Sequence, residues 1–96
     1  MPRKSGQPKV PTTTRFTQAI AEELRAVRAR ENRTQQWLGA AIGRDQTYAG
    51  RVINGLVAPT TDELVLLCTA LGVPVMELLA RAERNHDDPD WQPKSA

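Results

Sequence analysis

Apolar residues recur at helical spacing along the middle of the chain. The first stripe follows the spacing i, i+4, i+8 and i+11 and consists of Phe16, Ile20, Leu24 and Val27. Residues at this spacing share one face of an α-helix. The pattern predicts a first helix from near Thr17 to near Arg30, and no segment alternates apolar and polar residues as a half-buried β-strand does.

The stretch TQQWLGAAIG, residues 34–43, predicts a short second helix. The hydroxyl of Thr34 can accept a hydrogen bond from a free backbone N–H group of the first turn, and Gly43 stops the helix. The inward side chains of this helix are Leu38, Ala41 and Ile42.

A third helix follows after a very short turn. Asp45 is a good N-cap for a helix from Gln46 to about Ile53, which Asn54-Gly55 ends. Its apolar face is formed by Ala49 and Val52, with Tyr48 at the edge. Because only residues 43–45 separate it from the second helix, the two helices must meet at a steep angle, which is the geometry of a helix-turn-helix.

Two further helices are predicted after this pair. Thr60 and Glu63 form a T-x-x-E capping box behind Pro59, and Gly72 ends the helix that they start. The inward residues of that helix are Leu64, Leu67, Cys68 and Leu71. Pro74 suits the first turn of a fifth helix that ends near Arg81. The sequence therefore predicts an all-α fold of five short helices.

Length and composition limit the fold to one small domain. The chain has 96 residues, of which 40% are hydrophobic and 25% charged. No apolar run approaches the roughly 18 to 20 residues of a membrane span, and the N-terminus lacks the apolar core of a secretory signal, so we expect a cytoplasmic protein. The lone cysteine, Cys68, permits no internal disulfide and no cysteine-rich metal site, and we expect it to be packed in the core.

The two ends differ from the middle in composition and in charge. Residues 1–14 are basic and broken by proline and glycine, which predicts a disordered arm, and residues 82–96 predict a flexible acidic tail around a helix-turn-helix domain at 15–81. From Met1 to Gly55 there are ten Lys or Arg residues and four acidic ones, a net charge of +6, whereas the remainder carries −4. The first part is the one suited to meeting a polyanion.

The third helix carries a polar face opposite its apolar one. At about 100° per residue, four residues fall within an arc of about 140°, namely Gln46, Thr47, Gly50 and Arg51. Glutamine can pair with adenine, threonine can contact the thymine methyl group or a phosphate, and arginine can bind guanine through two hydrogen bonds. We therefore predict that Gln46, Thr47 and Arg51 contact DNA bases.

Phosphate contacts are predicted beside this face. Free N–H groups at the start of the second helix favour an anion near Gln35 and Gln36. The other predicted phosphate contacts are Arg44 and Asn54, which flank the third helix, and Gly50, where a missing side chain allows close approach. The basic residues of the N-terminal arm that we expect to reach DNA are Arg3, Lys4 and Lys9.

From about Ala19 to Leu79 the chain resembles the Cro/C1-type helix-turn-helix proteins, the XRE family, which includes phage repressors. The segments TQQWLGAAIG, RDQTYAGRVINGLVAP and LVLLCTALGVPVMELL carry the resemblance. The positions that match the family pattern are Leu38, Ile42, Gly43, Val52, Gly55, Pro59, Leu64, Leu71 and Gly72. The resemblance implies a compact five-helix, lambda-repressor-like domain that binds DNA.

Three positions depart from the family pattern. The family usually has alanine where Gly39 stands and a larger aliphatic residue where Ala49 stands. It often has a glutamate where this chain has Ile53, and that glutamate commonly pairs with an arginine matched here by Arg28. Arg28 must therefore find another acceptor or remain solvated.

Other polar and aromatic residues have simpler explanations than DNA binding. The arginines around the end of the first helix are expected to be solvated or paired with Glu22, Glu23 and Glu31; they are Arg25, Arg28, Arg30 and Arg33. Trp37 and Tyr48 are expected to pack, because the few aromatic residues form no stacking array. His86 has no partner at metal-ligand spacing, and we assign it no role.

We expect a sequence-specific DNA-binding transcriptional regulator, a small repressor, that uses no metal or cofactor. The chain lacks a glycine-rich phosphate loop, the motif G-x-S-x-G and the motif H-E-x-x-H, so we do not expect an enzyme. The alternative is a helical interaction module, such as an antitoxin-like protein whose DNA contact is secondary, and the apolar Leu66, Val75 and Trp91 favour some protein surface.

A homodimer on DNA is also expected. One recognition helix addresses only a few base pairs, so two half-sites about one helical turn apart are the usual solution. The predicted dimer interface consists of Leu66, Val75, Leu78 and Leu79.

Overall fold

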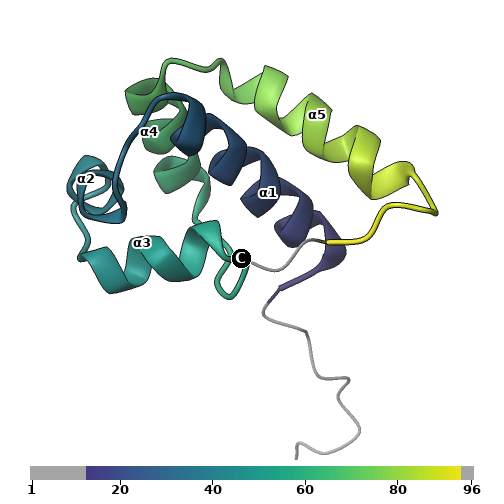
Figure 1. The fold of residues 1–96 in the computed structure, drawn as a ribbon, viewed down its shortest axis with the longest axis horizontal. Helices are drawn as coiled ribbons and strands as arrows, with labels where there is room; N and C mark the ends of the chain where they lie inside the picture. Colours follow the sequence, from purple (N-terminus) through teal and green to yellow (C-terminus); the bar gives the residue numbers. More distant parts are fainter. Residues whose placement is uncertain (1–12, 94–96) are drawn as a thin grey trace, which may run out of the picture.

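The computed structural model describes residues 13–93, which form five helices and, within that range, no strand. The helices are α1 (Arg15–Arg30), α2 (Gln35–Ala41), α3 (Gln46–Ile53), α4 (Thr61–Leu71) and α5 (Val75–Asp87). Figure 1 shows α1 and α5 side by side, whereas α2 and α3 lie together at the other side of the domain. The predicted all-α fold of five short helices is confirmed.

Side-chain caps fix where four of the helices begin. The hydroxyl of Thr34 accepts from the N–H of Trp37 at 3.0 Å, and a carboxylate oxygen of Asp45 accepts from the N–H of Tyr48 at 2.8 Å. Thr60 caps α4 as predicted. The first helix begins at Arg15, before the predicted Thr17, because Thr14 and Thr17 form a reciprocal capping box.

The last helix is longer than predicted. It continues to Asp87 instead of ending near Arg81, so residues 82–87, which we assigned to the acidic tail, are helical. The reason is contact with α1: Ala82 is fully buried, Asn85 donates to Glu23 at 3.3 Å, and the ring of His86 packs edge-on against Phe16 at 5.5 Å. These contacts lie about 60 to 70 positions apart in the chain, and helical periodicity alone does not reveal them. His86 therefore has a packing role.

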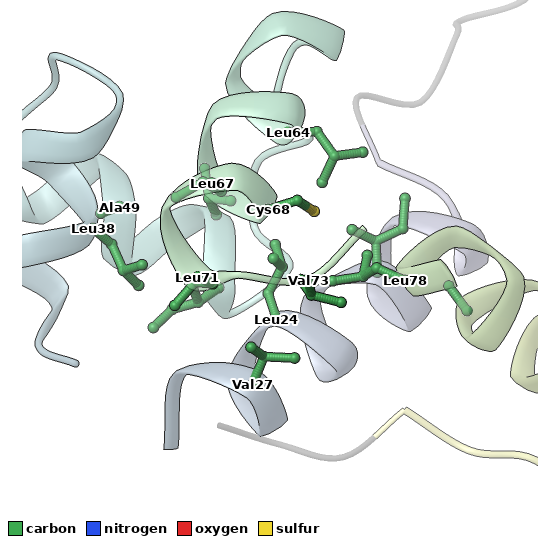
Figure 2. Packing of buried hydrophobic residues seen from close by; sticks show 14 of the residues in the cluster. Leu24, Val27, Leu38, Ala49, Leu64, Leu67, Cys68, Leu71, Val73 and Leu78 are labelled. Carbon is green, nitrogen blue, oxygen red and sulfur yellow. The ribbon is translucent and has the colours of Figure 1, made fainter. Parts of the chain in front are cut away.

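The apolar stripes of all five helices meet in one core (Figure 2). Its members include the predicted residues Ile20, Leu24, Val27, Leu38, Ile42, Ala49, Val52, Leu64, Leu67, Cys68 and Leu71. Burial raises the pKa of the Cys68 thiol, so this cysteine stays protonated and packs as a small apolar residue, as predicted. Phe16 and Trp37 pack against the edge of the core.

None of the helices between residues 13 and 93 is both long and apolar enough to cross a membrane. The helices α4 and α5 reach the length and composition of a span only when they are taken together, and they are bent by 108° at the break between them.

The turn between α2 and α3 passes unusually close to α2. The backbone N–H of Arg44 donates to the carbonyl of Gly39 at 2.8 Å. A Cβ atom at Gly39 would lie 2.8 Å from the carbonyl oxygens of both Arg44 and Asp45. These are backbone atoms, which cannot rotate away as the end of a side chain can. Glycine rather than alanine at position 39 is therefore explained by a turn that leaves no room for a methyl group.

We predict that Gly39→Ala lowers the free energy of unfolding. Alanine favours a helix over glycine by about 1 kcal/mol, but crowding in a packed site costs about 1 to 3 kcal/mol, and we expect crowding to dominate. Urea denaturation measures the difference. The control is Ala40→Ser at the exposed neighbouring position, which should change stability by less than about 0.5 kcal/mol. A Gly39→Ala protein more stable than wild type would show that the turn relaxes freely.

Candidate nucleic-acid interface

The third helix has a buried face and an exposed polar face. Ala49 and Val52 are 2% and 1% exposed. The three residues predicted to read bases lie on the other side of the helix and are all exposed, namely Gln46, Thr47 and Arg51. The structure therefore brings these three side chains together on one short helical surface that is open to a ligand.

Gly50 does not belong to that exposed surface. It is buried, and a Cβ atom there would lie 2.9 Å from the side-chain oxygen of Gln35. The close approach that glycine permits is made by Gln35 of α2. The prediction that Gly50 contacts a phosphate is therefore wrong, because the side chain of another helix covers the position.

The remaining residues predicted to contact phosphate lie at the start of α2 and at the end of α3. Gln36 is exposed in the first turn of α2, and Gln35 is half-buried where it lies over Gly50. Asn54 is the half-buried C-cap residue of α3. Arg3, Lys4 and Lys9 of the predicted arm lie outside the described residues.

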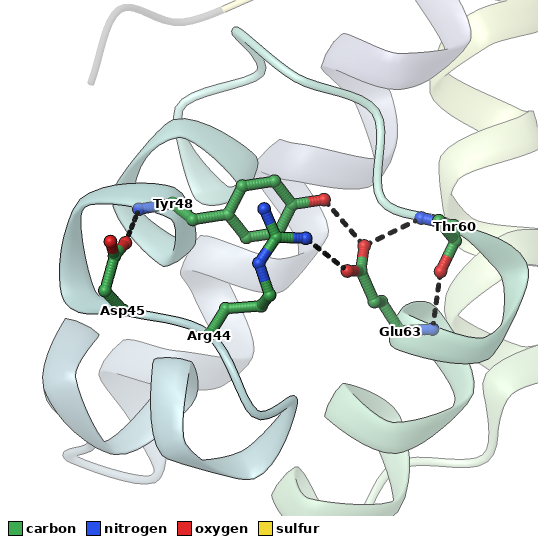
Figure 3. Close-up of polar contacts among 5 residues, drawn as sticks. All are labelled: Arg44, Asp45, Tyr48, Thr60 and Glu63. Atoms are coloured by element: carbon green, nitrogen blue, oxygen red, sulfur yellow. Dashed lines mark hydrogen bonds and ion pairs between the residues drawn. The ribbon is translucent and has the colours of Figure 1, made fainter.

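Glu63 ties the start of α3 to the start of α4 (Figure 3). One carboxylate oxygen accepts from the hydroxyl of Tyr48 at 2.7 Å and from the backbone N–H of Thr60 at 3.0 Å. The other oxygen pairs with the guanidinium of Arg44 at 3.1 Å. Arg44 also lies over the ring of Tyr48, 3.5 Å from its centroid. Arg44, predicted to contact a phosphate, is thus already paired within the protein.

These contacts change the acidity of both partners. Burial alone would raise the pKa of Glu63, but hydrogen bonds from Tyr48 and Thr60 and the charge of Arg44 outweigh burial and lower that pKa. The hydrogen bond to Glu63, together with burial, raises the pKa of Tyr48 above its ordinary value of 10.0. At neutral pH Glu63 is therefore a carboxylate and Tyr48 a hydroxyl donor.

Arginines of α1 contact backbone carbonyls beyond their own helix. Arg25 donates to the carbonyl of Ile53 at 2.5 Å, at the end of α3. Arg28 donates to the carbonyl of Arg33 at 2.9 Å, so it does find an acceptor other than a glutamate at position 53. The guanidinium of Arg33 lies 4.4 Å from the ring centroid of Trp37. These carbonyl acceptors leave no signal in the sequence, because any residue type can supply one.

The predicted dimer interface is only partly available. Leu78 is fully buried in the core, so its assignment to an interface is wrong. Leu66 is 47% exposed, whereas Val75 and Leu79 are half-buried. Met76, which is not one of the predicted interface residues, is 71% exposed. It borders an open groove of about 220 Å³ whose lining residues are Phe16, Met76, Leu79, Ala80 and Glu83.

We predict that Glu63→Gln weakens folding more at neutral pH than at acid pH. Because the folded-state pKa of Glu63 is lowered from its ordinary value of 4.5, its contribution is present above that value and disappears as pH falls through the folded-state pKa. The substitution should cost about 1.5 to 3 kcal/mol at neutral pH. Denaturant unfolding at pH 7 and pH 3 measures the difference.

Asp62→Asn is the matched control for this prediction. Asp62 lies in the same helical turn and is exposed, so its substitution should have a small effect at both pH values. An equal loss of stability by Glu63→Gln at pH 7 and pH 3 would contradict the role of the charge.

Comparison with known proteins agrees with this geometry. A family profile described as a helix-turn-helix domain matches residues 19–82. Among solved structures, the chain is similar to the clp gene regulator ClgR from Corynebacterium glutamicum, with 25% identity and a TM-score of 0.70 over 79% of this chain and 80% of that one. No curated protein sequence matches the chain. The α2–turn–α3 arrangement and the profile that spans most of the five helices show that this chain belongs to the helix-turn-helix domain family.

Proposed function

We propose that the protein is a sequence-specific DNA-binding transcriptional regulator that inserts α3 into the major groove. The observation that carries this proposal is the two-sided character of α3. Its apolar face is buried against the rest of the domain, while Gln46, Thr47 and Arg51 are exposed together on the other face. A helix of this kind fits the major groove of B-form DNA. The likeness to the regulator ClgR supports the same function.

Each exposed side chain has a suitable target in the groove. Arg51 can donate two hydrogen bonds to the acceptors of guanine, and Gln46 can pair with both polar groups of adenine. Thr47 can contact a thymine methyl group or a nearby phosphate. Reading several adjacent positions with three side chains gives sequence preference.

Phosphate contacts from the start of α2 and the end of α3 would fix the position of α3 on the duplex. Gln35 and Gln36 lie in the first turn of α2, and Asn54 is the C-cap residue of α3. Arg44 is not included, because its guanidinium is already paired with Glu63. Contacts with phosphate orient a protein without selecting sequence. The arm residues Arg3, Lys4 and Lys9 would add sequence-independent attraction. We further propose a Cro/C1-type repressor in the bacterial cytoplasm, which blocks transcription by occupying its site.

A helical interaction module is the second candidate. The observation that favours it is the set of large exposed apolar side chains, which are Leu56, Val65, Leu66 and Met76. Binding of labelled duplex DNA at several salt concentrations separates the two candidates, because phosphate contacts make affinity fall steeply with salt. A protein-binding module would show weak affinity and no preferred sequence.

We expect two copies of the protein to bind one operator. The groove beside Met76 and the exposed Leu66 offer apolar surface that a second copy can cover. One α3 helix reaches few base pairs, and a pair of half-sites gives the discrimination that a genome demands.

The first functional prediction concerns Arg51. Arg51→Ala should lower affinity for a selected site by about 1 to 3 kcal/mol and relax the preference at one base pair. Fluorescence anisotropy with the selected site and with single-base variants measures both effects. Arg84→Ala is the control, because Arg84 is exposed on α5, which is not part of the helix-turn-helix. Unchanged affinity and unchanged base preference in Arg51→Ala would exclude Arg51 from base reading.

The second functional prediction concerns stoichiometry. Sedimentation of the complex on a selected site should give two proteins per duplex, and the selected sequence should contain an inverted repeat. Met76→Gln should weaken the pairing of the two copies, because it places a polar side chain in the apolar groove. One protein per duplex with no inverted symmetry would overturn the dimer.

A further inference from the structure

Glu63 lies outside the helix-turn-helix, yet it contacts that motif at two places. Glu63 lies in the first turn of α4, and its side chain is only 12% exposed. One carboxylate oxygen accepts a hydrogen bond from the hydroxyl of Tyr48, and the other accepts one from the guanidinium of Arg44. Figure 3 shows the carboxylate between these two side chains on one side and Thr60 on the other. Thr60 holds the carboxylate in place through its backbone N–H.

The contact with Tyr48 fixes how α3 is turned about its own axis. Tyr48 follows Thr47 directly and lies two residues after Gln46, so a shift of Tyr48 moves the base-reading side chains with it. A hydrogen-bonding site must be held within roughly 0.5 Å and 10 to 20° to work well. The bond from Tyr48 to Glu63 joins α3 to a different helix and restricts that motion.

The contact with Arg44 has a separate effect on charge. Arg44 is 47% exposed in the turn before α3, two residues before Gln46. An unpaired arginine there would attract phosphate regardless of sequence. The carboxylate of Glu63 neutralises this charge, and the ring of Tyr48 holds the guanidinium against the protein.

We propose that Glu63 is a positioning residue that increases the preference of this protein for its operator over other DNA. It does so in two ways: it orients α3 through Tyr48, and it limits non-specific phosphate binding by Arg44. This inference rests on the proposed DNA-binding function and assigns a determinant of specificity outside the reading surface.

The test compares Glu63→Gln with wild type on two duplexes, the selected site and a scrambled sequence, over a range of salt concentrations. Releasing one arginine for a phosphate contact should steepen the plot of log affinity against log salt by about 0.9 on the scrambled duplex. A neutral amide oxygen accepts a weaker hydrogen bond from Tyr48 than a carboxylate does, so the ratio of specific to non-specific affinity should also fall, by up to roughly tenfold, the size of one impaired base contact. A merely structural loss of stability would lower both affinities together and leave the salt slope unchanged.

Three further variants separate the two effects. Tyr48→Phe removes only the hydroxyl, so it should lower the specificity ratio without changing the slope. In an Arg44→Gln background, Glu63→Gln should no longer steepen the slope. Asp62→Asn removes an exposed negative charge from the same turn of α4, and it should leave the ratio unchanged.

The outcomes distinguish this inference from the proposed function. A wild-type protein without preference for any selected site would overturn the proposed function itself. If wild type shows preference but Glu63→Gln keeps both the wild-type ratio and slope, the positioning role is wrong. If Glu63→Gln does not fold, as judged by circular dichroism, Tyr48→Phe decides, and an unchanged specificity ratio in that variant overturns the inference.

Discussion

A helix of eight residues does not keep its shape alone in water, and α3 has eight residues. Its geometry therefore depends on what the rest of the domain provides. Burial of Ala49, Val52 and Ile53 holds one face, and the carboxylates of Asp45 and Glu63 hold the first turn. The other helices serve largely as the support for this short segment, which explains why polar contacts gather at both of its ends.

The two ends of α3 are held by different chemistry. At the start, a charged carboxylate organises Tyr48 and Arg44. At the end, Arg25 donates to the carbonyl of Ile53, and Gln18 donates to the carbonyl of Gly55 at 2.7 Å. A backbone acceptor is present whatever side chain occupies the position. The contact from Arg25 to the end of α3 therefore does not depend on the side chain at position 53, which is isoleucine here.

Local signals were sufficient to predict most of the helices, and contacts between distant segments account for the errors. Thr34, Asp45 and Thr60 cap helices as predicted, because a cap acts within one turn of its own position. Gly50 and Leu78 were misplaced because their exposure depends on which distant side chain covers them. The Thr60–Glu63 box was visible in the sequence. The other partners of Glu63 were not, since Tyr48 on α3 and Arg44 in the turn before α3 lie 15 and 19 positions away.

Contact between α1 and α5 has a consequence for the order of folding. The pair packs more extensively than any other, although its members lie at opposite ends of the described chain, whereas α2 and α3 are neighbours in sequence. Local contacts need little loop closure and form early, and contacts between distant segments form late. Arg15 donates to the carbonyls of His86 and Asp88, and these hydrogen bonds can form only after α5 is complete. During synthesis, the helix pair that would read DNA therefore leaves the ribosome well before the helix that completes its support.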